Sequence, residues 1–400
     1  MRYRLFNDKG TGFITLLVPA CLSRDAMMAG GAALSVSQLD SKNQEGLMIN
    51  RALMTDEKSG VHEFSSTSID LIGDWTLTLC GTGEEFKVEL PGDVYSSLVE
   101  VGKIPDPYYG RNEEDVQWVR ENDWEYKRTF QVEEGVLDRD LVYLNADSLD
   151  TVAKIRVNGH LIGETENMFR RYRFNVKPYL REGENVIEIF FRSPEYAAAD
   201  AARRVPYSVP YIKHNKVPYM NLLRKVQSHA GWDWGICLAG VGVYGDLSIT
   251  AVDEARIEHV YTEQKHKNSS CEVTVTSEVY AAEGGGQLEY KVRLGKQWES
   301  KMFTLDAGIN KLELEVTIDD PELWWPTGYG PQNLYDMKVT VGGQSVKKKI
   351  GLRELEVVHE ELKNEWRYDD GGVNSGKGLT FRVNGVDIFC KGANWIPIDA

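Results

Sequence analysis

The segment Ala153-Lys154-Ile155-Arg156-Val157-Asn158-Gly159-His160-Leu161-Ile162 is the clearest folding signal in the chain. Apolar and charged residues alternate up to Val157, which is the period of a strand with one buried face. Asn158-Gly159 then offers two residues that accept positive φ, as a tight hairpin turn requires, and an apolar pair follows. The stretch predicts an antiparallel hairpin and directs the search toward other short strands.

Short strands are expected on both sides of this hairpin. Residues 75–79 and 86–90 alternate around a glycine-containing turn, residues 185–191 add another strand, and residues 240–249 a closing one. Helices are few: Asp93 is expected to cap one that ends near residue 101, Asn112 to cap a further turn, and residues 196–204 to form another. Many short strands with few helices predict a jelly-roll-like β-sandwich over residues 66–252.

The pattern of strands and turns changes after this region. Residues 271–276, 288–294, 311–316 and 334–341 alternate cleanly between glycine-rich turns, which predicts an immunoglobulin-like β-sandwich over residues 253–352. A second Asn-Gly hairpin, at residues 381–389, lies in a further segment, residues 353–400. Residues 1–65 show no sustained periodicity and are expected to be a leader or a poorly ordered extension.

Composition narrows the class of protein. The 400 residues suit two or three domains. The 61 acidic residues outnumber the 46 basic ones, for a formal charge of −15, and no basic stripe interleaved with aromatics runs along the sequence, so no nucleic-acid partner is expected. No apolar run approaches the length of a membrane span, so none is expected.

Metals and cofactors are not indicated either. The five cysteines are scattered and include no C-x-x-C pair, which argues against a disulfide framework or a structural zinc site. No metal-ligand spacing or phosphate-binding glycine loop occurs. The short apolar run at residues 13–20 contains Pro19 and is a weak export signal. This favours a cytoplasmic location over export without deciding between them.

The pentapeptide Gly231-Trp232-Asp233-Trp234-Gly235 carries the strongest chemical signal. Two tryptophans beside one carboxylate provide flat apolar faces for the C–H patches of a sugar and an acceptor for its hydroxyls. The alternative is a turn whose tryptophans fill a sandwich core while Asp233 bonds the amides of its own turn. His229 either orients Asp233 or is structural, and both interpretations stay open on the residues alone.

Several motifs together resemble one family, the β-mannosidases of glycoside hydrolase family 2. The resemblance covers about residues 66 to 400. It implies a jelly-roll sugar-binding domain, an immunoglobulin-like domain and then a (β/α)₈ barrel whose first strands fall in residues 353–400. The overall fold class is therefore mainly β, with the barrel truncated. The motifs are residues 118–130, 157–159, 231–235, 323–335, 350–353 and 381–397, which end in Lys391-Gly392-Ala393-Asn394-Trp395-Ile396-Pro397.

The resemblance also implies a function. Members act on terminal non-reducing β-D-mannose residues in β-D-mannosides with retention, using an acid/base and a nucleophile glutamate on later barrel strands. Both glutamates are expected beyond Ala400, so no catalytic residue is assigned, and the chain is expected to be an N-terminal fragment without activity of its own. Glu360-Glu361 and Asp369-Asp370 are expected to be solvated. The residues expected to bind a mannoside or glycan substrate are Trp232, Asp233, Trp234, Asn394 and Trp395.

Two alternatives remain at this stage. One is another β-glycosidase of the same family, such as one acting on glucosaminides. The other is a non-catalytic carbohydrate-binding β-sandwich protein. Trp324 and Trp325 are expected to wedge the immunoglobulin-like domain against its neighbours rather than to contact sugar.

Overall fold

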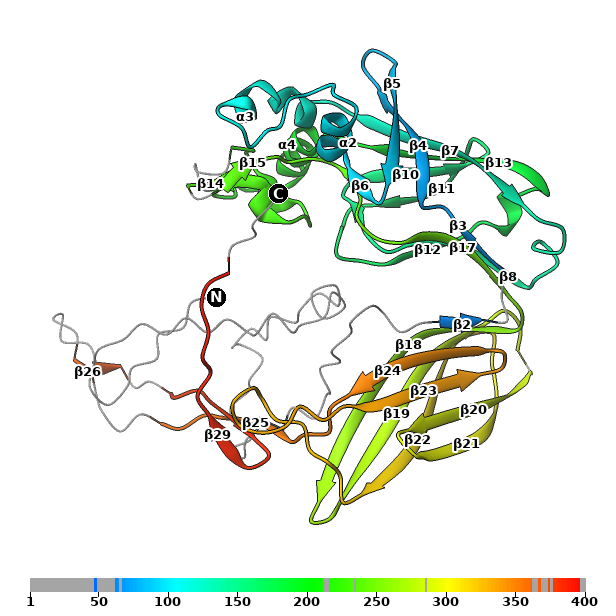
Figure 1. Ribbon diagram of the computed structural model, residues 1–400, viewed down its shortest axis with the longest axis vertical. Helices are drawn as coiled ribbons and strands as arrows, with labels where there is room; N and C mark the ends of the chain where they lie inside the picture. The colour runs from blue at the N-terminus through cyan, green and yellow to red at the C-terminus, as the bar shows by residue number, and fades with distance from the viewer. Residues whose placement is uncertain are drawn as a thin grey trace. The chain divides into compact units, whose positions relative to one another are not determined.

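The computed structural model describes residues 47–48, 62–64, 67–211, 216–233, 235–284, 286–361, 366–367, 373–374 and 377–395 (Figure 1). The chain divides into two compact units, Ser66–Asp253 and Glu254–Trp395, and each is described by itself. The extension predicted over residues 1–65 lies outside the described residues, apart from β1 (Leu47–Met48) and β2 (His62–Phe64), which pair with strands of the second unit.

The first unit is an antiparallel β-sandwich. Its six-stranded sheet has the order β11-β10-β13-β7-β4-β5, and its four-stranded sheet the order β12-β8-β17-β3. The strands are β3 (Thr67–Asp70), β4 (Gly73–Leu79), β5 (Glu84–Leu90), β7 (Trp124–Val132), β8 (Leu141–Ala146), β10 (Ala153–Val157), β11 (His160–Thr165), β12 (Tyr172–Asn175), β13 (Gly183–Phe191) and β17 (Leu247–Val252). Between the sheets lies one continuous apolar core.

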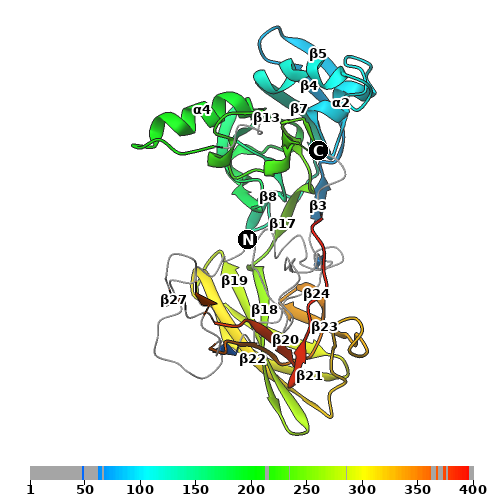
Figure 2. The ribbon, with the colours of Figure 1, turned by 90° about the vertical axis from the view of Figure 1, so that its left-hand side faces the viewer.

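Smaller elements complete this unit. A three-stranded sheet joins β6 (Gly92–Asp93), β16 (Gly242–Val243) and β9 (Leu149–Asp150), and a hairpin pairs β14 (Ala230–Trp232) with β15 (Gly235–Cys237). The helices are α2 (Val94–Glu100), α3 (Asn112–Asp115) and α4 (Pro194–Arg204), which stands at the edge of the unit in Figure 2. The 3₁₀ turns are η2 (Gln117–Glu121), η3 (Lys177–Tyr179), η4 (Met220–Leu222) and η5 (Gln227–His229).

Large aromatic side chains tie the loop elements to the sheet. Trp124, Tyr126 and Phe191 are fully buried, and the rings of Tyr126 and Phe191 meet edge to face with centroids 5.8 Å apart. The indole Nε1 of Trp124 donates to Val119 O at 2.9 Å, which fastens η2 to strand β7. The elements that carry the candidate site are therefore anchored to the main core.

Most predicted elements of this unit are confirmed. Asn158 and Gly159 form the hairpin turn with φ of 51° and 82°. Asp93 caps α2 by accepting from the amides of Tyr95 and Ser96. The capping role predicted for Asn112 is wrong. Arg111 is the N-cap of α3, and the Asn112 amide instead donates to Asp106 O at 2.8 Å.

The closing strand predicted over residues 240–249 is also corrected. Two strands, β16 and β17, occupy this stretch and belong to different sheets. Gly245, between them, lies so close to Asp147 that an added Cβ would approach the Asp147 Cβ to 2.7 Å. The chain therefore changes sheets where only a glycine fits.

The second unit is a two-sheet sandwich. One sheet joins β18 (Ala255–Lys267), β19 (Ser270–Ala281) and β22 (Gly308–Asp319). The other has the order β2-β24-β23-β20-β21. Its further strands are β20 (Gln287–Leu294), β21 (Gln297–Thr304), β23 (Tyr335–Val341) and β24 (Gln344–Ile350). The apolar residues of both sheets meet in one core, so the mainly-β class is confirmed, whereas β18 and β21 were not foreseen.

A small sheet is built mainly from strands that follow this sandwich in the chain. It joins β1, β25 (Leu355–Val358), β28 (Thr380–Val383) and β29 (Val386–Ile388), and a separate pair joins β26 (Trp366–Arg367) and β27 (Val373–Asn374). The predicted second Asn-Gly turn is confirmed, with φ of 50° at Asn384 and 78° at Gly385. That residues 353–400 begin a barrel stays a prediction.

Candidate functional site

The pentapeptide forms a tight hairpin. Ala230 pairs with Cys237 and Trp232 with Gly235, so Asp233 lies in the turn between the strands. Gly231 has φ of 75°, and a Cβ placed there would approach the Cys237 Cβ to 3.0 Å. The first glycine of the motif is therefore required both by its backbone conformation and by the close approach of the opposite strand.

The side chains of the turn face outward to different extents. Asp233 is exposed and makes no hydrogen bond or ion pair with any described residue, whereas Trp232 is half-buried and has contacts of its own. Trp234 lies outside the described residues. A carboxylate at the tip of a hairpin is accessible to a ligand, and within the described chain it does not cap its own turn.

Polar side chains from α3 and η2 hold the outer edge of this hairpin. Glu113 Oε1 accepts from Cys237 N at 2.8 Å and pairs with the Lys216 ammonium. Gln117 Nε2 donates to Cys237 O at 3.0 Å, and Arg120 donates to Lys216 O at 3.1 Å. Because backbone groups at a strand edge need partners, these bonds stabilise a hairpin too short to be stable alone.

A buried ion pair fastens the base of the same loop. Lys225 and Asp150 are 1% and 0% exposed, and the Lys225 ammonium binds the Asp150 carboxylate. The ammonium also donates to Gly240 O at 2.8 Å, so one cation ties together strand β9 and both sides of the loop that carries the hairpin. A buried charge left without its partner is strongly destabilising, which makes this pair a constraint on the loop position.

His229 lies beside this ion pair. Its Nδ1 is 3.9 Å from Asp150 Oδ2 and has no hydrogen bond within the described chain. Burial, followed by the nearby Lys225 ammonium, lowers the pKa of His229 to about 4, against the opposing effect of Asp150. The imidazole is therefore neutral at neutral pH. Its contacts make it part of the loop base and place none of its atoms on Asp233.

The other predicted binding residues belong to the second unit. Asn394 and Trp395 lie in the segment after β29, which has no regular secondary structure, and both are exposed, Trp395 by 72%. The sequence-based expectation that they share a subsite with the pentapeptide stays a prediction, because the two groups lie in different units.

Contacts with the sandwich hold the hairpin that precedes Asn394. The Asn384 amide donates to Trp324 O at 3.1 Å, and its oxygen accepts from Glu354 N at 2.9 Å. The Arg353 guanidinium lies 4.8 Å from the centroid of the Trp324 ring. Trp324 thus lies between the sandwich and the β28–β29 hairpin.

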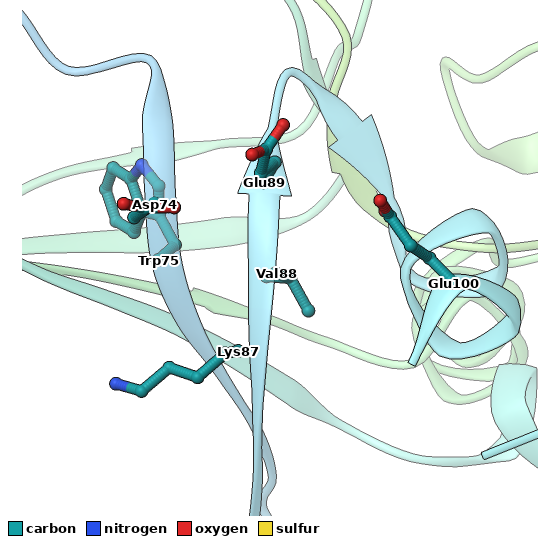
Figure 3. Close-up of a pocket in the computed structure, with 6 residues that line it drawn as sticks. All are labelled: Asp74, Trp75, Lys87, Val88, Glu89 and Glu100. Carbon is teal, nitrogen blue, oxygen red and sulfur yellow. The ribbon is translucent and has the colours of Figure 1, made fainter. Parts of the chain in front are cut away.

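A separate surface pocket opens on the first unit. It has a volume of about 520 Å³ (Figure 3). The Trp75 indole in its wall is 2% exposed and donates to Leu71 O at 2.8 Å, so its face is not available for stacking on a sugar. We therefore do not assign it as the sugar site. Its lining residues are Asp74 and Trp75 from β4, Lys87, Val88 and Glu89 from β5, and Glu100 from α2.

Metal sites and membrane-spanning helices are not found in the part of the chain that the structure describes. Within the described ranges, no three His, Cys, Asp or Glu side chains gather as a metal site requires. No helix among the described residues is long and apolar enough to cross a membrane.

The catalytic glutamates expected beyond Ala400 stay a prediction. Residues 396–400, Ala400 included, lie outside the described residues, which end at Trp395. Of the acidic pairs expected to be solvated, Glu360 and Glu361 are exposed, whereas Asp369 and Asp370 also lie outside the described residues. No described residue is therefore assigned as catalytic.

Sequence reasoning missed the supports of the hairpin. The sequence analysis assigns no site role to Glu113, Lys225 or Asp150. Glu113 and Cys237 are separated by 124 positions, and Asp150 and Lys225 by 75. The sequence offers no local signal for this pair, because Lys225 directly follows Arg224 and nothing in the stretch marks which of the two cations is buried.

Two family models match consecutive parts of the chain. The first, described as glycosyl hydrolase 2 galactose-binding domain-like, matches residues 75–245, and the second, described as glycosyl hydrolases family 2, matches residues 246–353. Their junction lies within ten residues of the division between the compact units, which falls after Asp253.

The chain belongs to glycoside hydrolase family 2. Among relatives, it is 34% identical over 322 residues to β-mannosidase B of Emericella nidulans, a match covering 78% of this chain and 36% of that protein. It is 31% identical over 358 residues to a probable β-mannosidase of Caenorhabditis elegans, covering 83% and 38%. The chain therefore spans little more than a third of the length of these family 2 relatives.

Solved structures also match this chain. The β-D-mannosidase of Dictyoglomus thermophilum superposes with a TM-score of 0.75 at 32% identity, over 83% of this chain and 40% of that one. An exo-chitosanase of Amycolatopsis orientalis superposes with a TM-score of 0.57 at 18% identity, over 83% and 37%, and this match shows the fold alone. Both matches extend over most of this chain.

Proposed function

We propose that this chain is the N-terminal portion of an exo-acting, retaining β-mannosidase and that its pentapeptide hairpin supplies part of the subsite for the terminal mannose. The supporting observation is the exposed Asp233 carboxylate on a hairpin held by Glu113, Gln117 and Lys225, in a chain more than 30% identical to β-mannosidases. In this proposal Asp233 accepts hydrogen bonds from sugar hydroxyls, and Trp232 and Trp234 provide stacking faces.

Asn394 and Trp395 complete the subsite in this proposal. They come after the β28–β29 hairpin in the segment proposed to begin the barrel, where active sites of that fold lie at the C-terminal ends of strands. The proposed division is residues 66–252 for sugar binding, 253–352 for the immunoglobulin-like sandwich, and 353–400 for the start of the barrel. The catalytic glutamates are proposed to lie beyond Ala400, so the 400 residues alone are proposed to lack hydrolytic activity.

The experiment is a comparison of kcat/KM on aryl β-mannosides in the complete gene product that contains this chain. Asp233→Ala is expected to lower kcat/KM by about 10- to 100-fold, because a sugar hydroxyl loses its charged acceptor. The matched control is Asp74→Ala, which removes an exposed carboxylate of the same unit beside the pocket of Figure 3 and should leave kcat/KM unchanged.

Three outcomes would contradict this proposal. Equal activity of the Asp233→Ala variant and the parent would remove the hairpin from the subsite. Preference for an aryl glucosaminide over an aryl mannoside would indicate a different glycosidase of the family. Turnover of a mannoside by the 400-residue chain, purified free of host glycosidases, would show that the chain contains catalytic groups of its own.

A further inference from the structure

The outer face of the five-stranded sheet in the second unit carries an unusual row of side chains. Strand register places Trp298 of β21 opposite Arg293 of β20, Arg293 opposite Lys338 of β23, and Lys338 opposite Lys347 of β24. Neighbouring strands lie about 4.8 Å apart, so three cations stand side by side in one line that ends at a tryptophan. Like charges directly opposite each other on a sheet are destabilising.

This face is net positive, whereas the whole chain is net negative. On β20, β21, β23 and β24, the residues of the outer face include five cations and two carboxylates, in a chain of net charge −15. Lys338 and Lys347 each have a further interaction of their own. The cations are Lys291, Arg293, Lys338, Lys347 and Lys349, and the carboxylates are Glu289 and Asp336.

The opposite sheet of the same sandwich differs in sign. On β22 the outward residues Glu313, Glu315 and Asp319 are exposed, with Lys311 as the only cation among the outward residues of that strand. The cationic row is therefore confined to one face of the sandwich, and it does not reflect a positive charge spread over the whole sandwich. Such a face attracts an anionic partner.

Trp298 identifies the kind of anion. Its side chain is 58% exposed, and the Lys291 ammonium lies 4.5 Å from its ring centroid, a cation–π contact that orients the indole on the face. Arg293, its direct neighbour, is positioned by a hydrogen bond from Nε to Gly295 O at 3.0 Å. A flat ring beside a line of cations suits a ligand that has apolar ring faces and regularly spaced negative charges.

We propose that this face, defined by Trp298, Lys291, Arg293, Lys338 and Lys347, binds an acidic polysaccharide whose sugar rings bear carboxylates. One sugar ring stacks on Trp298, and the carboxylates of neighbouring sugars lie along the cationic row, where adjacent strands repeat at a spacing comparable to one sugar residue. An acidic polypeptide meets the charge requirement but makes no use of the exposed indole. This site is separate from the pentapeptide hairpin and does not depend on mannosidase activity.

The test measures binding of the purified 400-residue chain to polygalacturonate by biolayer interferometry, at low and at high salt. Neutral galactomannan and polyglutamate are the comparison polymers. The parent chain should bind polygalacturonate in preference to both, and more weakly at high salt because the ion pairs are screened.

Two variants separate the two parts of the site. Trp298→Ala should weaken binding about tenfold and leave its salt dependence unchanged, since stacking on an aromatic ring is not an ionic interaction. Arg293→Gln should weaken binding at low salt and reduce the salt dependence. The control is Lys311→Gln, which makes the same charge change on the opposite sheet and should bind as the parent does.

A change in binding by these variants would not be explained by misfolding. All three substituted residues are exposed on the outside of the sandwich, and Arg293→Gln should leave thermal stability equal or raise it, because it removes a like-charge neighbour. The proposal is overturned if polygalacturonate binds no better than galactomannan, or if both variants bind as tightly as the parent. Equal binding of polyglutamate, unaffected by Trp298→Ala, would overturn it in favour of an acidic protein partner.

Discussion

The two groups of predicted sugar-binding residues are held in different ways. Asp233 lies on a hairpin whose strand β15 is bonded to α3 and η2 and whose base is tied to strand β9 of the first unit. Trp395 lies in a segment without regular secondary structure, 72% exposed, beyond the hydrogen bonds that hold the β28–β29 hairpin. One group is positioned by its own unit before any ligand arrives, whereas the other lacks such supports among the described residues.

This difference matters for binding because positioning costs entropy. A loop whose backbone is already held loses little freedom when a ligand arrives, whereas a loop without such supports must be ordered at that moment. If the proposed subsite is correct, the pentapeptide hairpin is the better positioned of the two groups. Substitutions at its base, at the β28–β29 hairpin and at the exposed side chains test how firmly each group is held.

The largest effect is expected at the base of the pentapeptide hairpin. Lys225→Met keeps the side-chain length but leaves the Asp150 carboxylate buried without its cation, which should lower the free energy of unfolding by about 3–5 kcal/mol. Urea denaturation measures this loss. Lys154→Met, which removes a lysine whose side chain is 53% exposed, is the control and should change stability by less than about 1 kcal/mol.

A double variant sharpens this result. Asp150→Asn combined with Lys225→Met leaves no buried charge and should recover part of the stability lost in Lys225→Met. If Lys225→Met were as mild as Lys154→Met, the ion pair would not constrain the loop.

The next effect depends on pH. His229 has a pKa of about 4 in the folded chain and an ordinary value of 6.5, so the unfolded chain takes up the proton first as pH falls. The contribution to stability is fully present above pH 6.5 and is lost between pH 6.5 and 4, by about 3 kcal/mol in total. Subtracting the pH profile of His229→Phe from that of the parent isolates this loss, and identical profiles would contradict it.

A smaller effect is expected in the β28–β29 hairpin. Asn384→Ala removes the bonds to Trp324 O and Glu354 N and strains a residue with φ of 50°, at a cost of about 2 kcal/mol. Asn384→Gly loses the same bonds but accepts the positive φ, so it should cost less. Thermal unfolding compares the two, and the reverse order would mean that backbone strain plays no part at this turn.

The smallest effects on stability are expected at the exposed side chains that are predicted to bind sugar. Asp233→Ala and Trp395→Ala should each change the free energy of unfolding by less than about 0.5 kcal/mol, because both side chains are exposed. Chemical denaturation of the 400-residue chain measures this. A loss above about 1 kcal/mol for Asp233→Ala would instead support the alternative in which the carboxylate bonds its own turn.

Patterns among neighbouring residues predicted the elements that depend only on interactions between neighbouring residues. Both Asn-Gly turns, the Asp93 cap of α2 and the alternating strands were predicted correctly, because each depends on neighbours within a few residues. Asn112 failed as a cap because it lies one position inside α3, after the N-cap Arg111, and its amide donates to Asp106 O instead. Strand β21 was missed because it lies at a sheet edge with almost all side chains exposed, so it shows no alternation of burial.

The sequence by itself determined that this chain is a mainly-β member of a sugar-hydrolase family, since the motifs of that family lie in consecutive residues, and it predicts an aromatic and acidic pentapeptide as the binding site. Only the tertiary structure decided what holds that pentapeptide and where the surface charge gathers. Asp150 reaches Lys225 through a side-chain ion pair between residues 75 positions apart, whereas Arg293 stands in line with Lys338 and Lys347 through strand pairing. Register between strands is set by the packing of whole sheets, so no single stretch of sequence contains it.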